Sequence, residues 1–177
     1  PMNHWIILPI LLPAIVAPVL VLAARYDLGL ARALSLGTAV LALGLALGLL
    51  LSASDSSVAQ VYALGDWPAP FGIVLVLDRL SALMLMLAAL LSLVVLLYAV
   101  GDSDGRGRHF HALWQFQVMG INGAFLTGDF FNLFVFFEVL LIASYGLMVN
   151  GGGAKRVRAG VQYVVVNLVG STMFRIA

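Results

Sequence analysis

The stretch Phe-Phe-Asn-Leu-Phe-Val-Phe-Phe-Glu-Val-Leu-Leu-Ile-Ala-Ser-Tyr, residues 130–145, decides the class of fold. It opens an apolar run of about 20 residues, which is the length that an α-helix needs to cross a bilayer. The run contains Glu138, the only glutamate in the chain. At about 1.5 Å per residue, this carboxyl lies roughly 12 Å from the start of the helix. The stretch therefore predicts a membrane helix with an ionisable group inside the hydrocarbon layer.

The composition of the whole chain agrees with this prediction. Of 177 residues, 63% are hydrophobic and 10% are charged, whereas a soluble domain is about half apolar and about a quarter charged. Apolar runs recur along nearly the whole length, which excludes one signal peptide followed by a soluble domain. We therefore predict an all-α, polytopic helical bundle that forms a single membrane domain over residues 1–177.

Windows of about 19 residues give six predicted spans. Residues 52–78, between the second and third spans, hold two strand-like runs around Gly-Asp-Trp-Pro-Ala-Pro and predict a short β-hairpin on the outer face. The last span stops at the chain end without a polar flank, so we expect the polypeptide to continue. The spans cover about residues 5–24, 33–51, 80–100, 110–127, 130–149 and 161–177.

The distribution of Lys and Arg predicts the orientation of the spans. Connections 25–32, 101–109 and 150–160 hold two, two and three basic residues, whereas the connections on the opposite side hold only Arg79. Basic connections face the cytoplasm in membrane proteins. We therefore expect these three connections to be cytoplasmic and the N-terminus to be external.

Small residues in the second span predict close helix packing. Gly44 and Gly48 form a G-x-x-x-G step, and Gly37 lies two turns earlier on the same face. Such steps let a neighbouring backbone approach closely. We expect a second helix to pack against this face.

The composition excludes nucleic acid as a partner and predicts that the chain has no metal or cofactor site. Nine Lys and Arg against eight Asp and Glu give a net charge of +1, which excludes nucleic acid as a partner. Cysteine is absent, and the three histidines lack the spacing of a zinc site, so we expect no metal and no bound cofactor. The turn 101–108 contains Asp102, Asp104 and Gly105, a fragment of a calcium-loop pattern without its closing Glu. We expect this segment to be a solvated turn.

Glu138 is the main candidate functional residue. An ionisable group at the centre of a membrane helix costs about 2.5–3.5 kcal/mol and normally faces the bundle interior. Burial favours the neutral carboxyl and a nearby cation favours the ionised form, so such a group can bind and release a proton. Tyr145 lies on the same helical face and is a possible accessory residue. The alternative is a structural carboxyl that locks two helices together.

Four other residues are candidates for lesser roles. Asp78 can be a second ionisable site or can form a local charge pair with Arg79. Asn122 and Asn167 can line a hydrated path or can hydrogen-bond between helices, and both readings stay open. Asp129 precedes the fifth span, where we expect it to cap the helix.

Residues 120–145 as a whole resemble the D subunit of the multisubunit Mrp-type Na+/H+ antiporters of bacteria. Residues 64–78 and 163–167 resemble the same family. The resemblance implies an antiporter-like fold of about fourteen helices, of which these six would be the first. It also implies a bacterial inner membrane, other antiporter subunits and the lipid bilayer as partners, and H+ and Na+ as transported ions. The chain would then be a secondary transporter subunit and not an enzyme.

The resemblance further implies a role for Glu138, which in this family pairs with a lysine on a later helix, beyond this sequence. Changes in that pair drive protons along a hydrated chain of Lys and His. Related subunits occur in respiratory complex I, an NADH-quinone oxidoreductase, and in membrane-bound hydrogenases, so a redox-driven proton pump is the first alternative function. A structural scaffold subunit that transports nothing is the second.

Two residues depart from the family pattern. Arg175 stands where we expect an apolar residue, and Pro1 precedes Met2, the expected start. From the rise per residue, Arg175 lies within about one helical turn of the depth of Glu138. We predict that its guanidinium pairs with the Glu138 carboxylate and holds it ionised. The competing outcome is that Arg175 turns toward the chain end and water.

Overall fold

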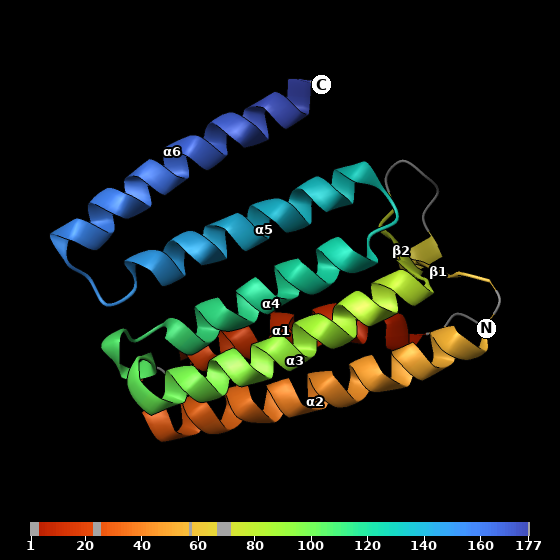
Figure 1. Ribbon diagram of the computed structural model, residues 1–177, viewed down its shortest axis with the longest axis horizontal. Coiled ribbons are helices and arrows are strands. Elements are labelled where there is room, and N and C mark those ends of the chain that lie inside the picture. The colour runs from red at the N-terminus through yellow and green to blue at the C-terminus, as the bar shows by residue number, and fades with distance from the viewer. Residues whose placement is uncertain (1–3, 23–25, 57, 67–71, 177) are drawn as a thin grey trace.

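The computed structural model describes residues 4–22, 26–56, 58–66 and 72–176, with side chains up to Met173. Through this part of the chain six α-helices run up and down, side by side (Figure 1). Each helix overlaps one predicted span, and the all-α polytopic fold is confirmed. The helices are α1 (Leu8–Leu22), α2 (Leu28–Asp55), α3 (Arg79–Asp102), α4 (Phe110–Leu126), α5 (Phe130–Val149) and α6 (Ala154–Ile176).

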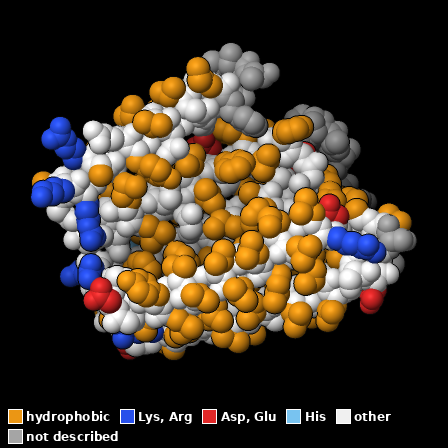
Figure 2. All heavy atoms as spheres, viewed as in Figure 1, with side chains coloured by type: hydrophobic (Ala, Val, Ile, Leu, Met, Phe, Trp, Pro, Cys, Tyr) orange, Lys and Arg blue, Asp and Glu red, His pale blue; other side chains and the backbone are white. Residues whose placement is uncertain are grey.

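The helices differ in length and in apolar character. Among the described residues α2, α3 and α5 are long and apolar enough to cross a bilayer, and α1 is a shorter apolar helix. Crossing of the bilayer by α1, α4 and α6 stays a prediction from the sequence. Lys and Arg side chains gather at one end of the molecule (Figure 2). We call this end, where α3 meets α4 and α5 meets α6, the basic end, and we call the opposite end the hairpin end.

Two helices begin earlier than the sequence predicts. The Asp27 carboxylate accepts a hydrogen bond from the Leu30 N–H at 3.1 Å, so the cap sets the start of α2 at Leu28. Arg32 therefore lies within α2 and not in a connection. The last helix begins at Ala154 and includes three basic residues that the sequence placed in the preceding connection. Lys and Arg are good helix formers, but a hydropathy window excludes them.

A two-stranded antiparallel hairpin lies at the hairpin end, as predicted. Strand β1 (Gln60–Ala63) pairs with β2 (Val74–Leu77), and Gln60 stands opposite Leu77. Tyr62, Leu75 and Leu77 are buried against the helices and join the main apolar core. The predicted position of this hairpin on the outer membrane face stays a prediction.

The hairpin also fixes the start of α5. The N–H of Gly128 donates to the Val74 carbonyl at 2.8 Å, which ties the turn before α5 to strand β2. The Asp129 carboxylate then accepts from the Asn132 N–H at 2.7 Å, so the predicted cap is confirmed. Together these contacts fix the register of α5 and therefore the position of Glu138, two turns further along.

The closest helix packing involves glycines of α4 and not those of α2. A Cβ added at Gly120 would lie 2.9 Å from the backbone nitrogen of Leu140 in α5, so only glycine allows this approach. At Gly37, Gly44 and Gly48, no atom of the described residues lies within 4 Å of an added Cβ. The prediction for these three glycines was wrong because α2 buries a different face, which is formed by Ala39, Ala46 and Ala53.

Two alanine substitutions distinguish these faces. Gly120→Ala is expected to destabilise the bundle by about 1–3 kcal/mol, because the new methyl meets backbone that cannot move aside. Gly44→Ala is the matched control, and it should be neutral or stabilising by up to about 1 kcal/mol, since Ala favours a helix. Unfolding of both variants in mixed micelles measures the difference. Equal stability of the two variants would contradict the close approach of α4 and α5.

Candidate functional site

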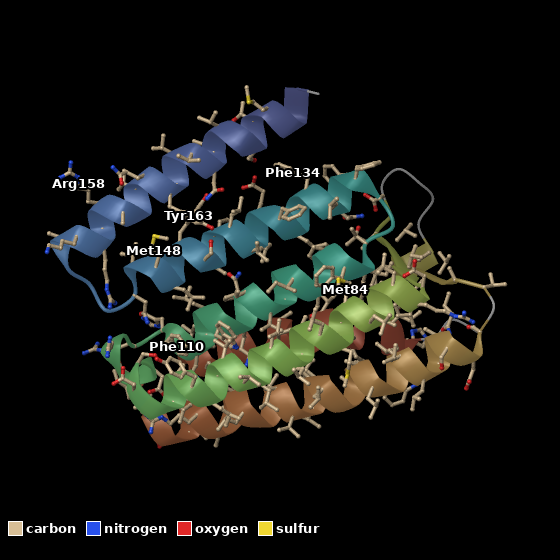
Figure 3. All side chains as sticks on the ribbon, in the orientation of Figure 1. Met84, Phe110, Phe134, Met148, Arg158 and Tyr163 are labelled. Atoms are coloured by element: carbon tan, nitrogen blue, oxygen red, sulfur yellow. The ribbon has the colours of Figure 1, made fainter. Side chains whose placement is uncertain are left out.

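Glu138 lies at the middle of α5, on the face that packs along α6. Its side chain is partly buried, and one carboxylate oxygen accepts a hydrogen bond from the Ser171 hydroxyl. Phe134 from α5 and Tyr163 from α6 flank this region (Figure 3). The two helices enclose a cleft around the carboxylate. The cleft is lined by Phe134, Phe137, Glu138, Leu140, Leu141, Asn167, Gly170 and Ser171.

Polar side chains continue from Glu138 along the same helix interface. Tyr145 lies two turns beyond Glu138, on the same face of α5. Its ring meets the ring of Tyr163 edge to face, with centroids 5.3 Å apart. The Nδ2 atom of Asn167 is buried and has no hydrogen-bond partner among the described residues. Three of the residues singled out from the sequence, Glu138, Tyr145 and Asn167, therefore lie together between α5 and α6.

Sequence reasoning missed Ser171, the residue that holds the carboxylate. A periodic signal was present, because Tyr163, Asn167 and Ser171 are spaced four residues apart and therefore lie on one face of α6. Glu138 and Tyr145, seven residues apart, lie on one face of α5 in the same way. The two polar faces meet where α5 and α6 pack together.

Asn122 lies elsewhere, in the core between α4 and α1. Its Nδ2 donates to the Pro9 carbonyl at 2.8 Å. That carbonyl lacks its usual helical partner because Pro13, four residues later, has no N–H. Of the two readings left open by the sequence, the structure gives Asn122 the hydrogen bond between helices.

Asp78 serves as a helix cap. Its carboxylate accepts hydrogen bonds from the Ser81 hydroxyl and N–H, both at 2.7 Å, and these bonds hold the pKa of Asp78 below its usual value. The neighbouring Arg79 donates instead to the Ser54 carbonyl at 3.3 Å. Of the two readings for Asp78, the charge pair with Arg79 is not formed within the described residues, because capping α3 draws the carboxylate onto the helix end, and a role as a second ionisable site stays a prediction.

The pairing predicted for Arg175 stays a prediction. The Arg175 side chain, like Pro1, lies outside the described residues. Within the described residues, the hydrogen-bond donor found on the Glu138 carboxylate is Ser171.

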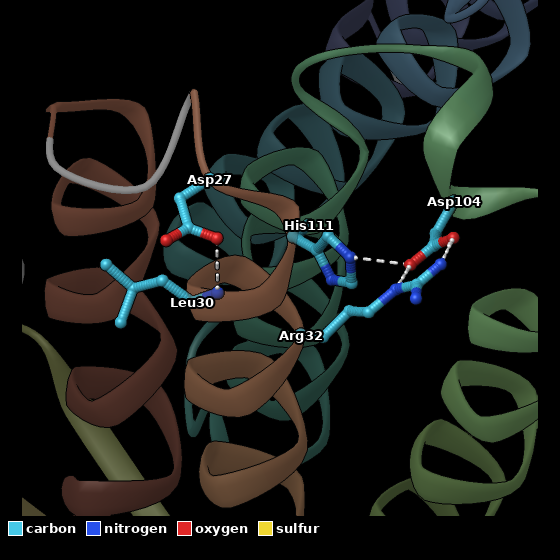
Figure 4. Close-up of polar contacts among 5 residues, drawn as sticks. All are labelled: Asp27, Leu30, Arg32, Asp104 and His111. Atoms are coloured by element: carbon cyan, nitrogen blue, oxygen red, sulfur yellow. Dashed lines mark hydrogen bonds and ion pairs between the residues drawn. The ribbon is translucent and has the colours of Figure 1, made fainter.

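A second polar cluster lies at the basic end (Figure 4). The Arg32 guanidinium makes two hydrogen bonds to the Asp104 carboxylate, from Nε at 2.6 Å and from Nη2 at 2.7 Å. His111 Nε2 lies 3.2 Å from the same carboxylate. These hydrogen bonds, above all the one from Arg32, hold the pKa of Asp104 below its usual value. We call these three residues the basic-end triad.

The triad corrects the prediction of a solvated turn at 101–108. Asp104 is only 1% exposed, although Asp102 and Arg106 beside it are exposed. Its partners are far away in the sequence, since Arg32 precedes it by 72 residues. No local pattern could have revealed the contact.

Comparison with solved structures defines the class of protein. The chain superposes on a chain of the membrane-bound sulfane sulfur reductase, an archaeal respiratory membrane complex, with a TM-score of 0.91 over 98% of this chain and 36% of that chain. At 24% identity, this likeness shows the fold alone. A chain of the Mrp complex from Dietzia sp. DQ12-45-1b gives a TM-score of 0.89 at 35% identity, over 99% of this chain and 34% of that chain. The fold is that of antiporter-like membrane subunits.

Sequence relatives narrow this class further. The chain is 51% identical over 99% of its length to the D subunit of the probable K+/H+ antiporter of Rhizobium meliloti (strain 1021). It is 43% identical over 98% of its length to the D subunit of the Na+/H+ antiporter of Alkalihalophilus pseudofirmus. It spans about a third of these relatives, 33% and 35% of their lengths. No family model matches the chain. The resemblance to the antiporter D subunits, first indicated by residues 120–145, is confirmed over nearly the whole sequence.

Proposed function

We propose that this chain supplies a proton-binding carboxylate, Glu138, to the membrane subunit of a monovalent cation/proton antiporter. The observation that carries the proposal is the position of this single glutamate in the cleft between α5 and α6, held by Ser171. The names of the relatives support proton exchange against Na+ or K+. Other antiporter subunits are the proposed partners, and the chain acts as a transporter subunit and not as an enzyme.

The surroundings of Glu138 suit reversible proton binding. The Ser171 hydroxyl donates to the ionised carboxylate, and Asn167 Nδ2 is a second donor without a partner among the described residues. The hydrogen bond from Ser171 favours the charged form. Phe134 and Phe137 line the same cleft, and their apolar rings favour the neutral form. A carboxyl held between such opposing influences can take a proton from water in the cleft and return it.

Proton movement in everted membrane vesicles tests the proposed function. Respiration first establishes a proton gradient, and electron flow is then stopped. Added Na+ or K+ should dissipate the gradient only when the complex contains this chain. A redox-driven pump would move protons during electron transfer and would not respond to the added cation. A scaffold subunit would leave proton movement unchanged when its ionisable residues are replaced.

We also propose that the basic end is cytoplasmic and the hairpin end external, in a bacterial inner membrane. The chain has no cysteine, so single cysteines report their side of the membrane cleanly. Arg108 at the basic end and Asp55 at the hairpin end are both exposed. In intact cells an impermeant maleimide should label Asp55→Cys and not Arg108→Cys. The opposite result would reverse the proposed orientation.

A further inference from the structure

The basic-end triad lies outside the cleft that contains Glu138, and the proposed antiport chemistry does not use it. The triad joins three separate elements. Arg32 comes from the second turn of α2, Asp104 from the short 3-10 turn Asp104–Arg106, and His111 from the first turn of α4. A cluster of three ionisable groups, two of them almost fully buried, requires a physical explanation.

Hydrogen-bond chemistry fixes the tautomer of His111. The two bonds from Arg32 occupy both oxygens of Asp104 and hold it as a carboxylate. An ionised carboxylate only accepts hydrogen bonds, so Nε2 of His111, 3.2 Å away, must carry the proton. Neutral His111 is therefore the Nε2–H form. Its other ring nitrogen, Nδ1, then presents a free lone pair.

This lone pair is buried without a partner. The Nδ1 atom of His111 makes no hydrogen bond within the described residues, and the side chain is only 5% exposed. A buried hydrogen-bond acceptor without a partner is costly unless a water molecule donates to it or it binds a proton itself. The two ring nitrogens thus have distinct roles, with Nε2 held by Asp104 and Nδ1 open to accept a proton.

The surroundings of His111 contain groups that favour protonation of Nδ1 and groups that oppose it, so this protonation is reversible. Burial is the largest influence and opposes the imidazolium, as does Arg32 on α2, whereas Asp104 on the α3–α4 connection favours it; the balance disfavours the charged ring. Helix α1 packs along α4 and has no ionisable side chain in Leu8–Leu22. On α5, Glu138 and Tyr145 lie toward α6. On α4 itself, the neighbouring His109 is exposed at the helix start.

A polar face of α4 leads inward from His111. Gln115 and Asn122 follow it by four and eleven residues, which places all three on one side of the helix, and both are buried. Gln115 and Asn122 also line a cavity with Thr38 from α2. Its water-accessible space is ≈ 10 Å³, about enough for one water molecule with polar partners.

We propose that His111 is a second proton-binding site of this chain, positioned by Asp104 and Arg32 at the basic end of the bundle. Nδ1 takes a proton from hydronium at this end, so that an N–H bond forms as an O–H bond breaks and a water molecule is left. In the reverse step the N–H bond breaks as an O–H bond forms on a water molecule at the same end. Asp104 is the positioning residue, because it selects the tautomer that leaves Nδ1 free.

The protonation of His111 can be measured directly. The chain is labelled with ¹⁵N-histidine, placed in lipid nanodiscs and followed by NMR as the pH is lowered. The His111 signals are assigned by their loss in His111→Gln and their retention in His109→Gln. We expect the Nε2–H tautomer at neutral pH and conversion to the imidazolium as the pH falls from about 6.5 to about 4.5, because burial opposes the charged ring.

Asp104→Asn separates the positioning role from simple packing. Loss of the negative charge should move the midpoint of the His111 titration down by about one pH unit or more and should remove the tautomer preference. Glu138→Gln should leave the titration unchanged, so failure of this proposal is distinguishable from failure of the antiport proposal. A His111 that stays neutral throughout this range, or that carries its proton on Nδ1, would overturn the assignment.

A transport measurement provides the second test. In everted vesicles that contain the assembled complex, His111→Gln should lower cation-dependent proton movement several-fold and flatten its pH dependence below about pH 6.5. His109→Gln, an exposed histidine two residues earlier, is the matched control and should match the wild type. Identical pH profiles for His111→Gln and His109→Gln would show that His111 has no part in proton movement.

Discussion

Glu138→Gln is expected to abolish cation-dependent proton movement while the complex still assembles. Glutamine keeps the shape of the side chain, and its amide oxygen can still accept the hydrogen bond from Ser171. The variant therefore preserves the contact between α5 and α6 but removes the group that binds a proton. Everted vesicles report the change as loss of the response to added Na+ or K+.

Two further variants define the role of this carboxylate. Glu138→Asp keeps an ionisable group but withdraws it by one methylene from Ser171, so we expect partial activity. Asp129→Asn makes the same carboxylate-to-amide change at the start of α5, where asparagine still caps a helix, and it should transport normally. Near-normal antiport by Glu138→Gln, with Asp129→Asn as reference, would refute a proton-binding role for Glu138.

The position of Glu138 inside an apolar helix, and the start of that helix, were readable from the sequence because they depend on local chemistry. A single glutamate inside an apolar helix conflicts with the bilayer unless it has a function or a partner. Asp129 stands directly before the helical run and has a short polar side chain that can reach the free N–H groups of the first turn. Neither inference needs knowledge of how distant segments pack.

Contacts between distant segments could not be predicted in the same way. Hydropathy placed Arg32 in a loop, although its guanidinium reaches Asp104 across 72 residues. The G-x-x-x-G step of α2 has the right spacing for close packing, but spacing does not say which face of a helix meets a neighbour. The close approach occurs instead at Gly120 of α4, against Leu140 of α5.

Asp104→Ala is expected to destabilise the bundle by about 1–3 kcal/mol, the usual cost of leaving a buried hydrogen-bond donor without its acceptor, because water screens the Arg32 side chain, which is 37% exposed. The Asp104 side chain is 2% exposed, and its loss leaves Arg32 and the Nε2–H of His111 without their acceptor. The start of α2, the α3–α4 connection and the start of α4 would lose the group that joins them. Reversible unfolding in mixed micelles measures the loss.

Asp102→Ala is the matched control for this variant. Asp102 also pairs with an arginine, Arg106, at 2.7 Å, but the two side chains are 71% and 53% exposed. Exposed pairs contribute little because water and salt screen them, so the change should stay within about 0.5 kcal/mol. The control is two residues from Asp104 in the same connection, so burial is the main difference between the two substitutions.

The stabilisation of the folded chain by the Asp104 carboxylate also depends on pH. The pKa of Asp104 is lowered in the folded chain, chiefly by the hydrogen bond from Arg32, so folding favours the carboxylate. Its stabilisation is fully present above the unfolded value, near pH 4, and is lost as the pH falls through the lower folded value. The stability gap between wild type and Asp104→Ala should therefore not narrow from about pH 7 to 5, where protonation of His111 can only widen it because Asp104 favours the imidazolium, and it should narrow only below about pH 4. A gap that closes between pH 7 and 5, or an equal loss in Asp102→Ala, would show that the buried Asp104 carboxylate does not hold these elements together.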